Sequence, residues 1–204
     1  MARLFTIGYA TKPIETFLAQ LSQYGIDVVA DVRSVPYSRV FTDYHRENLQ
    51  AHLRERGIRY VYLGAELGPR STDSAHYDER GQVQYDRLMA SIPFRQGIER
   101  LQNGVRKGFT VTLMCAEKDP AVCHRSLLVA CHLESAMQCG DSPIDSITHI
   151  THDGKVESQG DLRERLVALH GLESDLLRSP DEQLSEAYRL QIARYSYSRD
   201  PVAE

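Results

Sequence analysis

The chain of 204 residues has no apolar run that approaches the roughly 20 residues of a membrane-spanning helix. It also lacks the layout of a signal peptide, because residues 1–8 pass straight into a strand-like pattern. With 42% hydrophobic and 25% charged residues, the composition is typical of a soluble globular protein. We therefore expect a cytoplasmic protein without a membrane partner.

Positive charge is scarce as well. The net charge is −4 at pH 7, so no global positive field would draw the protein onto nucleic acid. Only four of the 24 basic residues are lysine. The others are arginine, whose planar fork of donors suits carboxylate and phosphate groups. This bias favours anion binding, although a compositional habit of the source genome would produce the same pattern.

The four cysteines form no Cys-x-x-Cys pair, and no His-x-x-x-His pair accompanies them. They recur every eight residues, at Cys115, Cys123, Cys131 and Cys139. Eight residues turn a helix about 80° past two full turns, so the four thiols cannot share one face. In a cytosolic chain, free thiols, catalysis or metal binding are better interpretations than disulfides. We predict no cofactor, and zinc is the alternative.

Apolar runs and helical periodicities alternate along the chain. The strand-like runs cover residues 4–9, 26–33, 58–63, 109–114 and 146–150, and a hairpin signal follows at Asp153-Gly154. This alternation predicts an α/β fold with a mostly parallel open sheet of about five strands and helices on both faces. We expect an α/β domain over residues 1–158, which carries the site, and a C-terminal helical extension with a tail over 159–204.

Two segments have no clear periodicity. Residues 64–83 are polar and rich in glycine, and a loop of this length is usually functional or disordered, so we expect a lid. The end of the chain, from Tyr195 to Asp200, is expected to be a loose tail.

Polar side chains follow every predicted strand at its carboxyl end. They are Tyr9 after the first strand, Asp31, Arg33, Tyr37 and Arg39 after the second, Tyr62 and Glu66 after the third, Cys115 and Glu117 after the fourth, and His149 with Thr151 at the fifth. In an open parallel sheet, ligands bind at this edge. The sequence therefore predicts a pocket there.

Asp31 and Arg33 are two residues apart and point to the same side of a strand. A charged pair at the end of a buried strand is costly unless it is paired or meets a ligand. One interpretation is an internal salt bridge that fixes the following loop. The other is that Arg33 and Arg39 hold an anion, while Asp31 orients them or binds a substrate hydroxyl.

The most informative stretch is the turn after the fourth strand, residues 113–125. Asp119 suits the N-cap of a helix and Pro120 its first position. Cys123, His124 and Arg125 would then lie near the positive end of the helix dipole, which favours a thiolate and an anion. The alternative is that Arg125 pairs with Glu117 or Asp31 and that Cys123 is a small core residue.

Two further residues have two interpretations each. Cys115 ends an apolar strand, where a buried cysteine is often only a small hydrophobic residue. His149 alternates within a strand and is either a hydrogen-bonded core histidine or a ligand-binding group. We assign no role to Cys131 or His132.

Four segments of the chain carry a family resemblance. They are Thr6-Ile7-Gly8-Tyr9, Asp31-Val32-Arg33-Ser34-Val35-Pro36-Tyr37-Ser38-Arg39, Gly57-Ile58-Arg59-Tyr60-Val61-Tyr62-Leu63-Gly64 and the block from Met114-Cys115-Ala116-Glu117 to Cys123-His124-Arg125. With these segments the chain resembles, over roughly residues 5–155 in matching order, the uncharacterised family catalogued as domain of unknown function 488. Tyr9 stands where the family opening usually has a histidine. The resemblance implies the architecture and the map of the site, and it implies no reaction.

The first functional hypothesis is an enzyme, a hydrolase or transferase, that acts on a phosphate-bearing substrate such as a nucleotide or nucleic-acid fragment. We expect Arg33, Arg39, Arg125 and His149 to bind the anion and Tyr9, Tyr37 or Tyr62 to stack on a base. Glu117, His124 and Asp31 would act on protons or hydroxyls, and Cys115 or Cys123 would be the nucleophile.

Three alternatives remain. The thiols could perform sulfur transfer or phosphatase-like chemistry, but Arg125 lies ten residues after Cys115 and two after Cys123, and the nucleophile loops of such enzymes separate cysteine and arginine by about six. Cys115, Cys123 and His124 could bind zinc together with Glu117 or His149. The protein could also be a binding module for nucleotides or nucleic-acid-associated partners. The sequence does not determine the substrate, the reaction or the oligomeric state.

Overall fold

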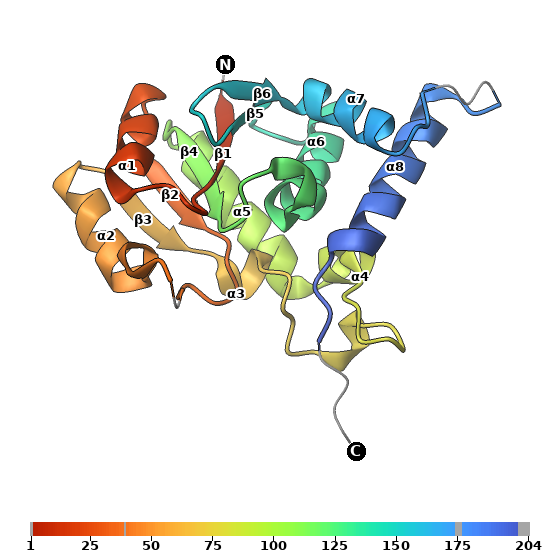
Figure 1. The fold of residues 1–204 in the computed structure, drawn as a ribbon, viewed down its shortest axis with the longest axis horizontal. Coiled ribbons are helices and arrows are strands. Elements are labelled where there is room, and N and C mark those ends of the chain that lie inside the picture. The colour runs from red at the N-terminus through yellow and green to blue at the C-terminus, as the bar shows by residue number, and fades with distance from the viewer. Residues whose placement is uncertain (1, 39, 174–176, 200–204) are drawn as a thin grey trace.

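A computed structural model describes residues 2–38, 40–173 and 177–199 of the chain (Figure 1). Arg39, one of the expected anion-binding residues, and Asp200, the end of the expected tail, lie outside the described residues. No helix within the described ranges is both long enough and apolar enough to cross a membrane.

The sheet has six strands in the order β3-β2-β4-β1-β5-β6. The strands are β1 (Arg3–Gly8), β2 (Val28–Asp31), β3 (Arg59–Tyr62), β4 (Val111–Cys115), β5 (Ser146–Ile150) and β6 (Val156–Ser158). The first five pair in parallel, and β6 pairs with β5 in antiparallel orientation. The predicted α/β fold with a mostly parallel sheet is confirmed, and the Asp153-Gly154 hairpin adds the sixth strand.

Helices connect the strands. They are α1 (Ile14–Gln23), α2 (Arg46–Glu55), α3 (Gly64–Leu67), α4 (Tyr85–Ala90), α5 (Ile92–Arg106), α6 (Cys131–Gln138), α7 (Gln159–Leu169) and α8 (Pro180–Tyr195). Shorter turns are the 3-10 helices η1 (Thr42–Tyr44), η2 (Ser74–His76) and η3 (Pro120–Val122) and the π-helical segment η4 (Arg125–Ala130).

Helices cover both faces of the sheet (Figure 1), and an apolar cluster lies on each face. On one face, α1 and α2 bury residues such as Phe17 and Leu53 against β1 and β2. On the other face, α5 and η4 pack on the sheet, and α7 and α8 join the same cluster through Leu162 and Tyr188. Burial on both faces explains the near-continuous apolar runs of the strands.

The strand order creates a switch point between the neighbouring strands β1 and β4. After β1 the chain passes over β4 to reach β2, and after β4 it passes over β1 to reach β5. The two connections therefore diverge onto opposite faces of the sheet. Such a divergence leaves a crevice at the carboxyl ends of the two strands, where open α/β proteins bind their ligands.

Residues 64–83, where a lid is expected, are ordered, and the expectation of a loose tail was wrong for the described residues 195–199. The loop contains α3 and η2 and buries Leu67, Tyr77 and Val83 in the core. The backbone N–H of Val83 donates to the carbonyl of Tyr197 at 2.9 Å, and that of Arg199 donates to Gly81 at 3.0 Å. Backbone hydrogen bonds therefore hold the two segments together. The sequence of neither segment predicts these bonds.

Candidate functional site

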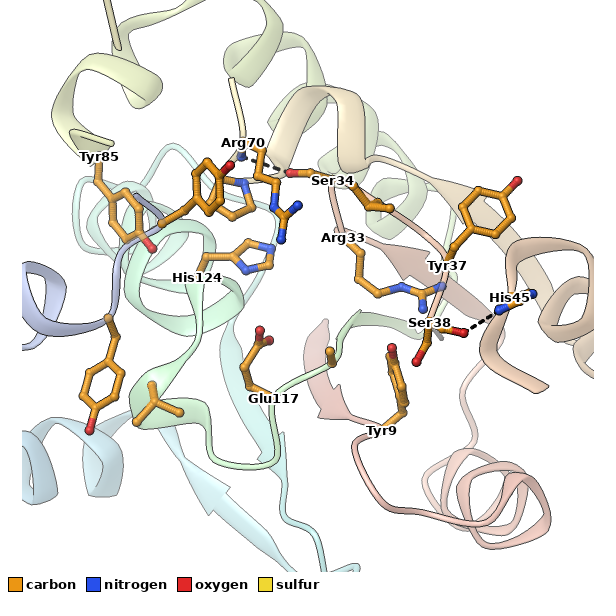
Figure 2. A pocket seen from close by; sticks show the side chains of 16 residues that line it. Tyr9, Arg33, Ser34, Tyr37, Ser38, His45, Arg70, Tyr85, Glu117 and His124 are labelled. Atoms are coloured by element: carbon orange, nitrogen blue, oxygen red, sulfur yellow. Dashed lines mark hydrogen bonds between the residues drawn. The ribbon is translucent and has the colours of Figure 1, made fainter. Parts of the chain in front are cut away.

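A pocket of about 860 Å³ opens at the carboxyl edge of the sheet, at the switch point between β1 and β4. Its walls come from the ends of β1, β2 and β4, from the loop after α3 and from the C-terminal segment. The lining residues are Tyr9, Arg33, Ser34, Val35, Tyr37, Ser38, His45, Pro69, Arg70, Tyr85, Ala116, Glu117, Val122, His124, Tyr195 and Tyr197. Figure 2 shows the guanidinium groups of Arg33 and Arg70, the ring of His124 and the carboxylate of Glu117 around one central space.

Arg33 and Asp31 form a buried ion pair at the end of β2. Arg33 Nε donates to Asp31 Oδ1 at 2.8 Å and Nη2 donates to Oδ2 at 2.6 Å. Arg33 Nη1 also donates to the carbonyl of Tyr44 at 2.9 Å. These bonds use three of the five N–H groups of the guanidinium, and the group still borders the pocket. Asp31 acts through Arg33, because the carboxylate is buried and does not line the pocket.

Tyr9 is held between two partners. Its ring stacks on Tyr44 with 4.2 Å between the ring centroids, and the Arg33 guanidinium lies 5.1 Å from its centroid. Only 3% of Tyr9 is exposed. Tyr9 therefore orients Arg33 and borders the pocket, while its ring face is already occupied by Tyr44.

Glu117 is in contact with both pocket and thiols. The Cys123 thiol lies 3.0 Å from Glu117 Oε2, and Cys115 Sγ lies 2.6 Å from Cys123 Sγ. Burial would raise the pKa of Glu117, but the His124 ring and hydrogen bonds from the two thiols lower it to about 2. The carboxylate is therefore ionised at neutral pH.

Both thiols lie behind Glu117 and outside the pocket wall. Cys115 is fully buried and Cys123 is 1% exposed. Burial, together with the neighbouring Cys123 thiol, raises the pKa of Cys115 well above its ordinary value, despite the nearby Arg125. Cys115 is accordingly a neutral thiol in this state.

Arg125 is fully buried beneath the site. Its guanidinium donates to Thr6 Oγ1 at 3.2 Å, to Cys115 Sγ at 2.7 Å and to the carbonyls of Glu117 and Lys118 at 2.8 and 3.3 Å. The alternative interpretation of the sequence was that Arg125 pairs with Glu117 or Asp31. In the structure Arg125 donates to the backbone carbonyl of Glu117. With these contacts Arg125 organises the loop after β4 and does not border the pocket.

The helix after β4 begins later than predicted. Asp119 and Pro120 do cap and open a turn, since Asp119 Oδ1 accepts from the N–H of Ala121 at 2.8 Å. That turn is the 3-10 helix η3, and Cys123 follows it in an extended conformation. The expectation that Cys123 lies within the first helical turns was therefore wrong. Its sulfur instead accepts from the N–H of Arg125, at 3.5 Å, ahead of η4.

His124 lies between the pocket and the thiols. Its Nε2 is 2.9 Å from the carbonyl oxygen of Val32, and because a carbonyl only accepts, Nε2 carries the hydrogen. In the neutral ring Nδ1 is then an acceptor, 3.8 Å from Cys123 Sγ. His124 thus offers a proton acceptor whose tautomer is fixed by the main chain.

His149 lies away from the pocket, within β5. Its ring bridges Thr6 Oγ1 and Gln159 Oε1, each at 2.8 Å, and it has no solvent exposure. The structure thus gives His149 the hydrogen-bonded core arrangement, one of the two interpretations of the sequence.

Tyr9, Arg33, Tyr37, Glu117 and His124 of the predicted site meet at the pocket. Sequence reasoning missed other lining residues, among them Ser34, Ser38, His45, Arg70, Tyr85, Tyr195 and Tyr197. Arg70 comes from the expected lid. The repeated tyrosines of the Tyr195-Ser196-Tyr197 segment were a signal against a loose tail.

The pocket combines positive charge with aromatic rings. Arg70 has no carboxylate partner among the described residues, and its guanidinium lies 4.7 Å from the centroid of Tyr197. Glu117 is the only acidic side chain among the described lining residues. Such a pocket can hold an anion on its guanidinium groups and a planar group against a tyrosine. The carboxylate of Glu117 and the two thiols together also form a group that could hold a metal ion.

A family model described as Domain of unknown function DUF488 matches residues 13–131, more than half of the chain. The match contains the segments after β2 and β4 and begins after Tyr9. No curated protein and no solved structure matches the chain significantly. The chain therefore belongs to the DUF488 family.

Proposed function

We propose that this protein is an enzyme that binds a phosphate-bearing ligand, a nucleotide or nucleic-acid fragment, in the pocket at the carboxyl edge of its sheet. The observation that carries the proposal is the convergence of Arg33 and Arg70 with several tyrosines on one space at the switch point. Guanidinium groups bind phosphate in pairs of hydrogen bonds, and every base has a face that can stack on an aromatic ring.

Arg70 is the principal anion-binding residue in this proposal. It is exposed, it lacks a carboxylate partner in the described chain, and its backbone N–H is fixed by Ser34 Oγ at 3.0 Å. Arg33 supplies its two remaining N–H groups from a fixed position, because Asp31 and Tyr44 hold the rest of the guanidinium. Tyr197, beneath Arg70, is the stacking surface for the base.

The chemical step uses His124 and Glu117. A carboxylate with a pKa of about 2 is a weak base, so Glu117 orients the ligand or stabilises positive charge. His124 accepts or donates the proton through Nδ1, since Nε2 is committed to Val32. Neither thiol lines the pocket, so thiol-dependent sulfur transfer has weaker support.

The test is a thermal-shift screen of the full chain against inorganic phosphate, nucleosides, nucleotides and short oligonucleotides. At a concentration about 100 times the dissociation constant, a specific ligand adds about 2.7 kcal/mol, or roughly 5–10 °C. We expect nucleotides to raise the melting temperature and nucleosides to do so much less. Arg70→Ala should abolish the shift, and Arg95→Ala, an exposed arginine on α5, should keep it.

Turnover separates an enzyme from a binding module. The wild type should convert the stabilising ligand, while His124→Gln and Glu117→Gln should bind it and convert it far more slowly. A ligand that stays unchanged over hours with the wild type would indicate a binding module. The absence of any shift, or an equal shift in Arg70→Ala, would contradict the proposal.

A further inference from the structure

Three side chains of metal-binding types meet beside the pocket, and the proposed function uses only one of them. The Sγ atoms of Cys115 and Cys123 and the carboxylate of Glu117 all lie within 4.8 Å of one another. From this geometry we propose that Cys115, Cys123 and Glu117 bind a divalent cation of the zinc type.

The donor set selects the ion. Two sulfur atoms and one carboxylate suit Zn²⁺, whereas Mg²⁺ and Ca²⁺ require oxygen ligands. Three protein ligands leave one position of a tetrahedral ion free. Glu117 borders the pocket, so that position faces the pocket and is available to water or ligand.

The charges around the cluster stay balanced when the ion binds. Without a metal, the charge of the buried Arg125 guanidinium is balanced by the carboxylate of Glu117. Zinc binding releases both thiol protons, and the two thiolates then balance the ion. The charge of Arg125 remains matched, and its 2.7 Å hydrogen bond to Cys115 Sγ becomes a bond to a thiolate.

Groups around the three ligands support the same assignment. Metal ligands are held by hydrogen bonds to neighbouring groups, as Arg125 holds Cys115 and the N–H of Arg125 holds Cys123. His124 Nδ1 lies 3.8 Å from Cys123 Sγ and is kept unprotonated in the neutral ring by the bond of Nε2 to Val32. His124 therefore lies beside the proposed ligand Cys123.

The two sulfur atoms would have to separate on binding. They are 2.6 Å apart, whereas bonds of about 2.3 Å to a tetrahedral zinc ion place two sulfurs about 3.8 Å apart. The competing outcome is a disulfide, with about 2.05 Å between the sulfurs. A disulfide would remove the thiol hydrogen with which Cys123 contacts Glu117, and the thiol titration described below distinguishes it from a metal site.

The test uses Co²⁺ as a spectroscopic substitute for zinc on the full chain, purified under reducing conditions and freed of metal with a chelator. We expect one Co²⁺ per chain, with sulfur-to-cobalt charge-transfer absorption that Zn²⁺ abolishes by competition. X-ray absorption of the zinc form should find two sulfur ligands at about 2.3 Å. Cys115→Ser and Cys123→Ser should lose the signal, and Glu117→Gln should weaken binding at least about tenfold.

The chain offers matched controls in its two other cysteines. Cys131 is partly exposed and Cys139 is exposed, and both lie on or just after α6. Cys131→Ser and Cys139→Ser should bind cobalt as the wild type does. Circular dichroism of every variant shows whether a lost cobalt signal is due to unfolding. If the cysteine variants are unfolded, cobalt binding by Glu117→Gln tests the inference.

Three results would overturn the inference. They are cobalt spectra without sulfur ligation, equal binding by Cys115→Ser or Cys123→Ser, and a thiol titration of unfolded protein, purified without reductant, that finds Cys115 joined to Cys123. None of these measurements requires the phosphate ligand proposed above. Metal binding and ligand binding therefore succeed or fail separately.

Discussion

Arg125 and Cys115 share a 2.7 Å hydrogen bond, from Nη1 to Sγ, in the interior of the protein. The same guanidinium also reaches Thr6 in β1 and the carbonyls of Glu117 and Lys118 after β4. Arg125 thus joins the two strands of the switch point and fixes the backbone that carries Glu117. The position of the Glu117 carboxylate therefore depends on Arg125, a side chain that does not line the pocket.

Arg125→Met should therefore destabilise the protein severely. The substitution leaves buried acceptors without donors, at about 1–3 kcal/mol each, so we expect a loss of about 3 kcal/mol or more. Unfolding in urea measures it. Arg54→Met, at an exposed position of α2, is the control and should stay within about 0.5 kcal/mol of the wild type. A similar small change for Arg125→Met would mean that the network does not hold the loop.

Gly8→Ala should displace the loop that carries Glu117. A Cβ atom at Gly8 would lie 1.8 Å from the carbonyl oxygen of Glu117, so one of the two backbones must move. We expect a loss of about 2 kcal/mol or more in the free energy of unfolding. Gly104→Ala, within α5, is the matched control. The new Cβ atom would lie 3.7 Å from Val111, an ordinary contact, so the substitution should stabilise the helix by about 0.5–1 kcal/mol. Equal effects of the two substitutions would refute the argument.

The stability of the protein should fall between pH 7 and pH 5 because of His149. Burial, helped by the charge of Arg125, lowers the pKa of His149 from 6.5 to about 4. Below pH 6.5 His149 becomes protonated in the unfolded chain, whereas in the folded chain it stays neutral until about pH 4. Acid therefore favours unfolding. The linked loss between pH 7 and 5 is about 2 kcal/mol.

Urea unfolding at several pH values checks this effect against His149→Gln, which does not titrate in this range. Glutamine can still hydrogen-bond to Thr6 and Gln159, the partners of the wild-type ring. The wild type should lose about 2 kcal/mol more than the variant between pH 7 and 5. Parallel pH profiles would show that another group causes the acid sensitivity.

Tyr197→Ala should weaken the proposed nucleotide binding. Removal of a stacked aromatic ring costs about 1–3 kcal/mol per base, which corresponds to roughly 5-fold to 150-fold in the dissociation constant. Calorimetric titration measures the change. Tyr197→Phe keeps the ring under Arg70 and should bind almost as the wild type does. Unchanged affinity in Tyr197→Ala would exclude this ring as the stacking surface.

The edge of the sheet could be read from the sequence because it depends on local patterns. Apolar runs such as residues 26–33 predict buried parallel strands, and the residues after them must reach the carboxyl edge. Tyr9, Arg33 and Glu117 were expected at this edge and His124 at the start of the following helix, and the structure brings these four to one pocket.

The direction of individual side chains could not be read in the same way. Cys123, His124 and Arg125 are consecutive, yet His124 borders the pocket while its neighbours are buried beneath it. Their directions depend on where the helix begins, and the 3-10 turn η3 and the π-helical η4 displaced that point. Such irregular turns are set by long-range bonds, here those of Arg125.

By itself, the sequence determined the alternation of strands and helices, the parallel sheet and the edge at which polar residues gather, because hydrophobic periodicity and capping residues act within a few positions. Only the tertiary structure decided which of those residues share a space. It placed Arg70 and Tyr197, which are 127 positions apart in sequence, on one wall, and it buried Arg125 and His149. Contacts between distant segments depend on the packing of the whole chain, which no local pattern encodes.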